Sequence, residues 1–377
     1  MKNHLDELKM PNISINHINR FLFQFPGGKA PALVIWLVIW NAAALAIGPN
    51  FDYYSKVKFE YQYSDYLEYG WPAAVEYAFS EHLYQQPNPL LASFPEHRWL
   101  TKVTQAFGPS LEIQLMYHYS FLGKNYFINA DGSRSEWNKS EHLYNSLLNY
   151  KLKDNLSLNG TVQYSLATGN QLSSYSAETA DLTGWMFDMG FDWDFAGFVR
   201  LEPSLSFFWN EVGGTKTNAQ SLNFKFRQAL SNTTALQVKY SYFHTDAIGN
   251  QPGLQYQTIT GWLSQWLPTQ TAVHLIYRHH ADNQNGVSNG PGIEISQYLD
   301  WATVMTLSYR NYKMTNDDPR SNFRQAINGD TFTSDAYSLI LSRTFWNDTV
   351  IAVKYRYYTT NQKVRMNTYL ISWEQVF

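Results

Sequence analysis

The residues with the greatest chemical potential in this 377-residue chain are charged side chains at every second position of alternating segments. In the segment 184–195, Asp188 and Asp192 share one parity, whereas six large apolar residues, from Trp185 to Phe195, share the other. A period of two is the pattern of a β-strand, which places the two sets on opposite faces. Charged groups that line one face of such a sheet can pair with one another or select passing solutes by charge.

The same parity, followed along the whole chain, predicts a charged lumen. We expect thirteen residues to line it: Lys58, Glu60, Glu112, Asp188, Asp192, Arg200, Lys225, Arg227, Lys239, Arg278, Arg310, Lys354 and Arg356. One interpretation is a constriction field that selects permeants by charge. The other is cross-strand pairing that neutralises the wall, for which Arg200 and Lys225 lie near Asp192 and Glu202 in strand order. The excess of basic residues hints at a preference for anions.

Catalytic and metal-binding interpretations have little support. His274 and His280 share a face, but a metal site needs three or more convergent ligands, and two histidines six residues apart along a strand are too distant. A hydrolase needs a Ser–His pair with an orienting partner, and His118 with Ser120 is a chance pairing in a serine-rich chain. The chain has no cysteine, which excludes disulfides, thiolate metal sites and covalent haem attachment. We therefore predict no enzymatic activity, metal or cofactor.

The composition suits a protein with one polar and one apolar surface. The mean hydropathy of −0.38 resembles that of a soluble protein, yet 17% of the residues are aromatic and only 16% are charged. A polar lumen and an apolar exterior cancel in such an average, as in a transmembrane β-barrel. The net charge of −3 argues against nucleic acid as a partner.

Alternating segments of roughly 10–14 residues recur after residue 50, and they predict a transmembrane antiparallel up-and-down β-barrel of about 16 strands, within a range of 14–18. The clearest members are 111–121, 156–166, 184–195, 199–209, 236–243 and 350–358. Weaker members start near residues 54, 97, 139, 219, 254, 270, 292, 301 and 335. No second helical-length apolar run follows residue 50, apart from a short amphipathic pattern within 67–96.

The connections between these segments alternate in length. Short turns are expected at 196–197, 231–233, 267–270 and 346–348, and long polar loops at 123–137, 169–181, 282–292 and 313–331. This alternation predicts short periplasmic turns and longer extracellular loops. Aromatic residues beside the turns, Trp193, Phe195 and Trp266 among them, predict a belt at one membrane interface, and a second belt is expected near the long loops.

The N-terminal region predicts export. Residues 31–46 are mostly apolar and end in Ala44-Leu45-Ala46, which fits a cleaved secretory signal peptide of residues 1–46, with a retained membrane anchor as the alternative. The positively charged segment before this run is long, so Met10 is a second candidate start. Residues 47–377 would then form the barrel, in which 67–96 is a long first loop with a short helix. That helix would either cap the rim or fold into the lumen.

The C-terminal segment "TYLISWEQVF" has the same alternation. Tyr369, Ile371, Trp373 and Phe377 share one face, from which polar Gln375 departs. This tail, together with the export signal, the strand count and the aromatic belts, resembles the porin-like outer-membrane β-barrels of Gram-negative bacteria. The resemblance implies that the four residues are an assembly signal read by the barrel assembly machinery, and that the last strand pairs with the first, near 54–66, to close the ring. The third loop, 169–181, lacks the acidic richness of general porins.

Two functions remain open. The first is a channel in the bacterial outer membrane that allows passive passage of small polar solutes or ions, with lipid and the barrel assembly machinery as its other partners. The second is a structural barrel that sheaths a secretion or electron-transfer partner, in its lumen or in the periplasm. A barrel enzyme or adhesin is a more distant third.

Overall fold

The computed structural model describes residues 55–66, 95–128, 134–173, 176–179, 182–195, 198–212, 214–246, 253–283, 286–316, 332–346, 348–361 and 365–377. The predicted signal peptide, its cleavage site and the helix expected in the first loop lie outside these residues. Within the described ranges, no helix is long and apolar enough to cross a membrane.

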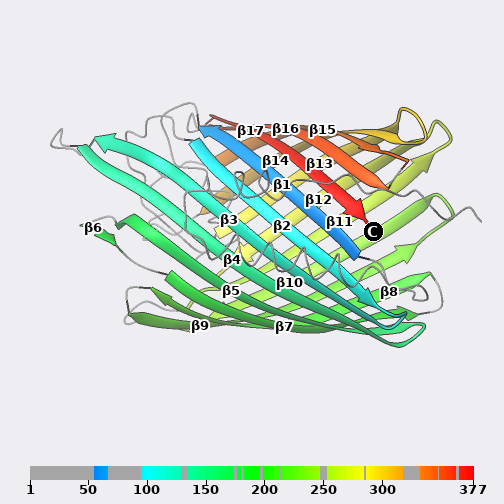
Figure 1. Ribbon diagram of the computed structural model, residues 1–377, viewed down its shortest axis with the longest axis horizontal. Helices are drawn as coiled ribbons and strands as arrows, with labels where there is room; N and C mark the ends of the chain where they lie inside the picture. Colours follow the sequence, from blue (N-terminus) through cyan, green and yellow to red (C-terminus); the bar gives the residue numbers. More distant parts are fainter. Residues whose placement is uncertain are drawn as a thin grey trace, which may run out of the picture. The chain divides into compact units, whose positions relative to one another are not determined.

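Sixteen antiparallel strands form one closed barrel, which confirms the predicted fold (Figure 1). A further short strand, β6, pairs only with β5. The elements are β1 (Ser55–Tyr66), β2 (Pro95–Phe107), β3 (Leu111–Ile128), β4 (Arg134–Lys153), β5 (Leu156–Ser173), β6 (Ser176–Thr179), β7 (Leu182–Phe195), β8 (Val199–Val212), β9 (Thr215–Ala229), β10 (Thr234–Thr245), β11 (Gln255–Leu267), β12 (Thr271–Asp282), β13 (Gly286–Tyr298), β14 (Thr303–Asn316), β15 (Phe332–Thr344), β16 (Thr349–Thr360) and β17 (Arg365–Val376).

The first and last strands of the barrel close the ring, as the sequence predicts. β1 pairs with β17 from Lys56↔Val376 to Tyr66↔Met366. Beyond the ladder, the Phe377 amide donates to the Ser55 carbonyl at 2.8 Å, and the Ser55 amide donates to the Phe377 carbonyl at 3.3 Å. Closure gives every barrel strand two neighbours, so no row of unpaired backbone groups remains at an edge.

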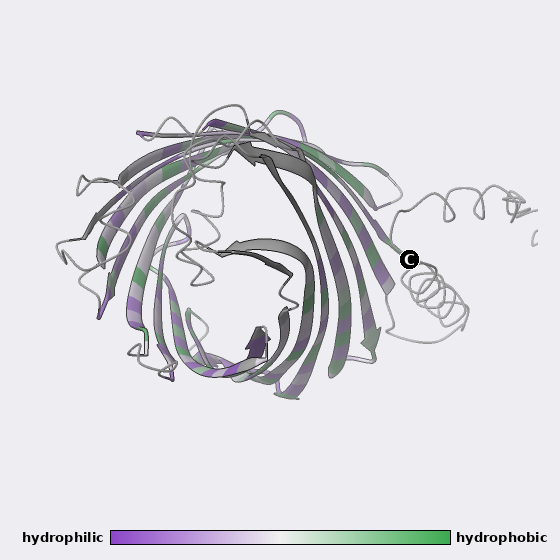
Figure 2. Cartoon of the chain, turned by 90° about the vertical axis from the view of Figure 1, so that its left-hand side faces the viewer, coloured by the Kyte–Doolittle hydropathy of each residue, from purple (hydrophilic) through white to green (hydrophobic). Residues whose placement is uncertain are grey.

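Hydrophilic and hydrophobic residues alternate along the strands (Figure 2), and this alternation places them on two opposite faces of the sheet. On β7 the large apolar residues point outward and stay accessible, with Met189 64% and Trp185 47% exposed. The same holds for Ile259 on β11 and Ile371 on β17. Such an extensive exposed apolar surface is unfavourable in water and is the outer surface of a barrel that faces hydrocarbon.

The strand connections confirm one part of the predicted alternation and correct another. The connections β2–β3, β4–β5, β7–β8, β9–β10, β11–β12, β13–β14 and β15–β16 are all two to four residues long and lie at the same end of the barrel as Phe377. We call this the tight-turn end and the opposite one the loop end. At the loop end, however, β8 and β9 are joined by residues 213–214 alone, with Gly214 at a φ of +81°.

Several segments predicted as loops are strands. β13 begins at Gly286, so 286–292 belongs to the sheet, and β3, β4 and β5 extend into 123–128, 134–137 and 169–173. The prediction was wrong there because it read polarity as the end of a strand. Backbone hydrogen bonds between neighbouring strands do not depend on side-chain polarity, so the ladders continue beyond the apolar band.

Trp266 is a second correction. Trp193 and Phe195 share the outer face of β7 and touch edge to face at 5.3 Å, as expected for a belt at the tight-turn end. Trp266 instead shares the parity of Trp262 on β11, on the inner face, and its ring contacts that of Tyr298 at 5.5 Å. Proximity to a turn indicated the height of Trp266 along the barrel but not the face it occupies.

Candidate functional site

The thirteen charged residues predicted to line the lumen all lie on the face opposite to the exposed apolar residues. Paired residues of adjacent antiparallel strands point to the same side, so the register can be followed from strand to strand. One row runs Glu202–Lys225–Lys239–Thr260–Arg278–Gly290 across β8 to β13. The remaining residues follow by the same parity along β1, β3, β7, β8, β9, β14 and β16.

One sector of this inner face is closely paired. We call the inner face of β7 to β9 the paired wall, and it contains Asp192, Arg200, Glu202, Lys225 and Arg227. Arg200 Nη2 lies 2.6 Å from Asp192 Oδ2, and Arg200 Nε lies 2.9 Å from Glu202 Oε1. The Glu202 carboxylate is also 2.8 Å from Lys225 Nζ and 3.2 Å from Arg227 Nε. The predicted pairing of Arg200 and Lys225 with Asp192 and Glu202 is therefore present.

The backbone of the paired wall is tightly packed at the centre of this network. Between β7 and β8 the ladder stops at Gly190↔Ser204 and resumes at Trp193↔Leu201, around Pro203, which has no amide hydrogen to donate. A Cβ on Gly190 would lie 2.6 Å from the Pro203 carbonyl oxygen. Glycine therefore allows β7 and β8 to approach closely where their charged side chains meet.

Ion pairs also occur at the seam between β1 and β17. Lys56 Nζ lies 2.6 Å from Glu374 Oε1, and Lys58 Nζ lies 2.9 Å from Glu60 Oε2. Of the predicted lumen residues, Lys58 and Glu60 are thus engaged with each other. Neutralising pairs of this kind leave little net field at the wall.

A second sector differs in charge. We call the part of the inner face of β10 to β15 around Lys239, Arg278 and Arg310 the basic wall. Glu294 lies on the same face of β13, opposite His274 and outside this part. All three cationic side chains are exposed to the lumen. Among the residues that the structure describes, no carboxylate lies within 4.0 Å of any of their charged nitrogens. The basic wall therefore presents three positive charges to the lumen without compensation at contact distance.

A pocket of about 480 Å³ lies against the basic wall. All three cations line it, and none of its described lining residues is acidic. Aromatic and small polar side chains also line it, namely Phe243, Tyr256, Trp262, Tyr312 and Tyr358 with Ser221, Asn223, Ser241, Thr258, Thr260 and Ser334. Of these residues the sequence singled out only the cations.

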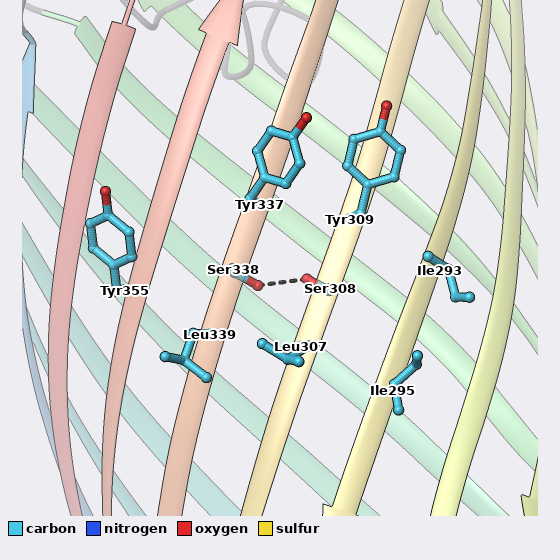
Figure 3. A pocket seen from close by; sticks show the side chains of 9 residues that line it. All are labelled: Ile293, Ile295, Leu307, Ser308, Tyr309, Tyr337, Ser338, Leu339 and Tyr355. Carbon is cyan, nitrogen blue, oxygen red and sulfur yellow. Dashed lines mark hydrogen bonds between the residues drawn. The ribbon is translucent and has the colours of Figure 1, made fainter.

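The outer face carries a groove of a different kind, with a volume of about 410 Å³, across β13 to β16 (Figure 3). Its lining is apolar apart from hydroxyl groups: Ile293, Ile295, Leu307, Tyr309, Tyr337, Leu339 and Tyr355, with the hydrogen-bonded Ser308 and Ser338 beside them. The tyrosine hydroxyls of Tyr309 and Tyr355 donate to Asp335 and Asn367, respectively. The groove thus offers hydrocarbon contact without unsatisfied hydroxyls at these two tyrosines.

The two histidines considered as metal ligands each lie within hydrogen-bond distance of a neighbouring hydroxyl group. His274 Nδ1 lies 2.8 Å from Ser264 Oγ, and His280 Nδ1 lies 2.9 Å from Thr258 Oγ1. Across the described ranges, no group of three or more His, Asp or Glu side chains is arranged to hold a metal ion.

Comparisons with known proteins add a resemblance of fold. No known protein family matches the sequence, and no curated protein matches it. Among solved structures, OccK7 (OpdD) of Pseudomonas aeruginosa is similar with a TM-score of 0.48 and 8% identity over 86% of this chain and 99% of that one. OccAB3 of Acinetobacter baumannii has a TM-score of 0.48 and 11% identity over 86% of this chain and 100% of its own. OprD of Pseudomonas aeruginosa has a TM-score of 0.46 and 10% identity over 88% of this chain and 97% of its own. With TM-scores below 0.5, these similarities carry no weight in assigning a function.

Proposed function

We propose that this protein is an outer-membrane channel that allows small polar solutes or ions to pass through a charged lumen. The observation that carries the proposal is a closed barrel of sixteen strands whose exposed apolar face is turned outward and whose charged residues are turned inward. The outer face requires hydrocarbon around it, because so many apolar side chains would otherwise contact water. Closed barrels of this type reside in outer membranes.

The number of strands supports a lumen that is wide enough to hold water. Barrel diameter grows with strand number, and about eight strands already enclose an interior that side chains can fill. Sixteen strands leave a wider interior, and the exposure of Lys239, Arg278 and Arg310 supports a hydrated wall. Passage would be passive, because the described residues offer charges and hydroxyl groups but no group arranged for covalent chemistry.

The C-terminal strand supports insertion by the barrel assembly machinery. Tyr369, Ile371 and Phe377 are 51%, 52% and 63% exposed on the outer face, and Trp373 stacks on Phe59 of β1 at 5.6 Å. The polar exception, Gln375, accepts a hydrogen bond from Thr349 of β16, which explains how it is tolerated there. These residues are presented on the lipid side as an assembly signal would be, and the tight-turn end would face the periplasm.

Deletion of Phe377 tests this part of the proposal. The deletion removes both backbone bonds to Ser55 and the terminal aromatic residue, so we expect less folded barrel in the outer membrane while export to the periplasm is unchanged. Fractionation with immunodetection measures both quantities. A normal outer-membrane yield would contradict the role of this residue in assembly.

Planar-bilayer recording tests the channel itself. Purified folded protein should produce discrete conductance steps in KCl, and the same preparation after heat unfolding should produce none. If the folded protein inserts but conducts nothing, the channel proposal fails and the scaffold alternative gains support. Co-purification from native membranes would then identify the sheathed partner.

A further inference from the structure

We infer that the basic wall holds a binding site for a small organic anion that carries a flat aromatic ring. This inference rests on the proposed channel, whose lumen would deliver the solute to the site. It deepens that function by naming a class of solute. Three features support it: the charge of the pocket, its aromatic side chains and two glycines of β13, of which Gly290 lines the pocket.

Charge favours an anion. Lys239 and Arg278 lie in one ladder row with Thr260 between them, which separates their backbones by two strand spacings, about 10 Å. Arg310 enters from β14 beside Gly292. Three cations that converge on one pocket without a described acidic residue leave an excess positive potential there, which a carboxylate can neutralise. Two of them are arginines, whose planar guanidinium groups can bind a carboxylate through two hydrogen bonds.

The aromatic side chains favour a ring. On the loop side of the cations, Phe243 and Tyr256 stack with centroids 4.8 Å apart and an interplanar angle of 17°. On the other side, Trp262 and Ile276 line the same pocket. Phe243 itself is buried, so the accessible aromatic surface is that of Tyr256 and Trp262. An inorganic anion would leave this surface in contact with water, whereas an aromatic ring would bury apolar area against it.

Two glycines lie beside the arginines of the site. On the inner face of β13, Gly290 and Gly292 lie between Arg278 of β12 and Arg310 of β14. A Cβ on Gly292 would approach Arg310 Cγ to 3.1 Å, and a Cβ on Gly290 would come within 3.7 Å of Arg278 Cβ. Gly290 therefore leaves room beside the Arg278 side chain in the pocket lining, and a side chain at Gly292 would crowd that of Arg310.

The size of the pocket suits a small solute. Its volume of about 480 Å³ falls within the range of roughly 300–1,000 Å³ that is typical of ligand pockets. Benzoate is therefore a suitable probe, because it combines one ring with one carboxylate. Acetate retains the charge without the ring, and benzyl alcohol retains the ring without the charge.

Ligand-observed NMR titration of the full chain in detergent tests the site directly. Benzoate should bind, and acetate and benzyl alcohol should each bind at least about tenfold more weakly, the change that accompanies the loss of about 1.4 kcal/mol. The double variant Arg278→Gln/Arg310→Gln should weaken benzoate binding by at least about tenfold, since it removes charge-assisted hydrogen bonds. Trp262→Leu should weaken benzoate but leave acetate unchanged.

The matched control is Arg343→Gln, which removes one positive charge from the outer parity of β15 and should leave benzoate binding unchanged. Equal binding of benzoate and acetate would overturn the aromatic part of the site, and unchanged benzoate binding in the double variant would overturn the site itself. Conductance separates this inference from the proposed function. Benzoate binding without conductance would refute the channel and keep the site, whereas conductance without benzoate binding would keep the channel and refute the site.

Discussion

Two sectors of the same inner face differ in how their charges are compensated. In the paired wall, the Glu202 carboxylate alone contacts Arg200, Lys225 and Arg227. In the basic wall, Lys239 and Arg278 continue the same ladder row but have no described carboxylate at contact distance. The transition occurs between Lys225 and Lys239, which are direct cross-strand partners.

This difference separates charges that brace the barrel from charges that are available to a solute. An ion pair holds two strands together but largely cancels its own field, whereas an uncompensated cation acts on anything that enters the lumen. Charge content alone therefore overstates how much of a lumen can select permeants. The contrast between the two walls leads to four predictions, which differ in the size of the effect that we expect.

Gly190→Ala should destabilise the paired wall most strongly. Its new Cβ would lie 2.6 Å from the Pro203 carbonyl oxygen, and such overpacking costs about 1–3 kcal/mol. The temperature at which the folded band disappears on SDS gels should fall. Gly261→Ala on β11 is the control, because nothing lies within 4 Å of its new Cβ. Equal melting temperatures of the two variants would contradict the tight packing inferred at Gly190.

Neutralising the basic wall should change ion selectivity. A unit charge about 8 Å from a permeating ion in water contributes roughly 0.5 kcal/mol. Replacing Lys239, Arg278 and Arg310 with glutamine removes about 1.5 kcal/mol of attraction for chloride and a similar repulsion of potassium, so the permeability ratio of chloride to potassium should fall by at least about tenfold. Reversal potentials in a KCl gradient measure this ratio. An unchanged ratio would show that the three cations do not act on permeating ions.

The double variant Asp192→Asn/Arg200→Gln tests whether the charges of the paired wall affect ion selectivity. It removes one negative and one positive charge from the paired wall, so ion selectivity should stay constant. Because the Arg200 side chain is 38% exposed, the lost pairing should cost at most about 1 kcal/mol of stability. Gel melting and reversal potentials report the two quantities. A selectivity change as large as that of the basic-wall variant would contradict the separation of roles.

Salt should have the smallest effect. The Debye length is about 10 Å at 0.1 M and about 3 Å at 1 M ionic strength. The selectivity difference between the native protein and the basic-wall variant should therefore shrink in concentrated KCl. A difference that persists at 1 M would indicate direct contact of the permeant with the cations instead of action through the field.

Much of the fold follows from the sequence because a barrel repeats one simple rule. The alternation in 184–195 fixes both the extended conformation and the face of each side chain, and the same holds for the C-terminal strand. The number of strands and the pairing of the last with the first were therefore predictable. Strand ends were not, as 286–292 shows, because backbone ladders persist where side-chain polarity gives no signal.

Only part of the candidate site could be predicted from the sequence. Parity identified Lys239, Arg278 and Arg310 as inward-facing, but it could not separate them from the residues of the paired wall. That separation depends on cross-strand register, which brings Glu202 beside Lys225 and leaves Lys239 beside Thr260. The contribution of Trp262 and the glycines of β13 depends on the register in the same way, since the pocket draws on strands far apart in the sequence.

The seam between β1 and β17 has a consequence for how the protein matures. Its partners Lys56 and Val376 are separated by 376 − 56 = 320 positions, which is nearly the whole length of the barrel. Contacts between residues so far apart in the sequence form slowly, because a long chain segment must be confined before they can contribute stability. The ring cannot close until the last residues have been synthesised and delivered. Until then the strand edges on both sides of the gap remain open, so the nascent barrel depends on protection from aggregation up to its final step.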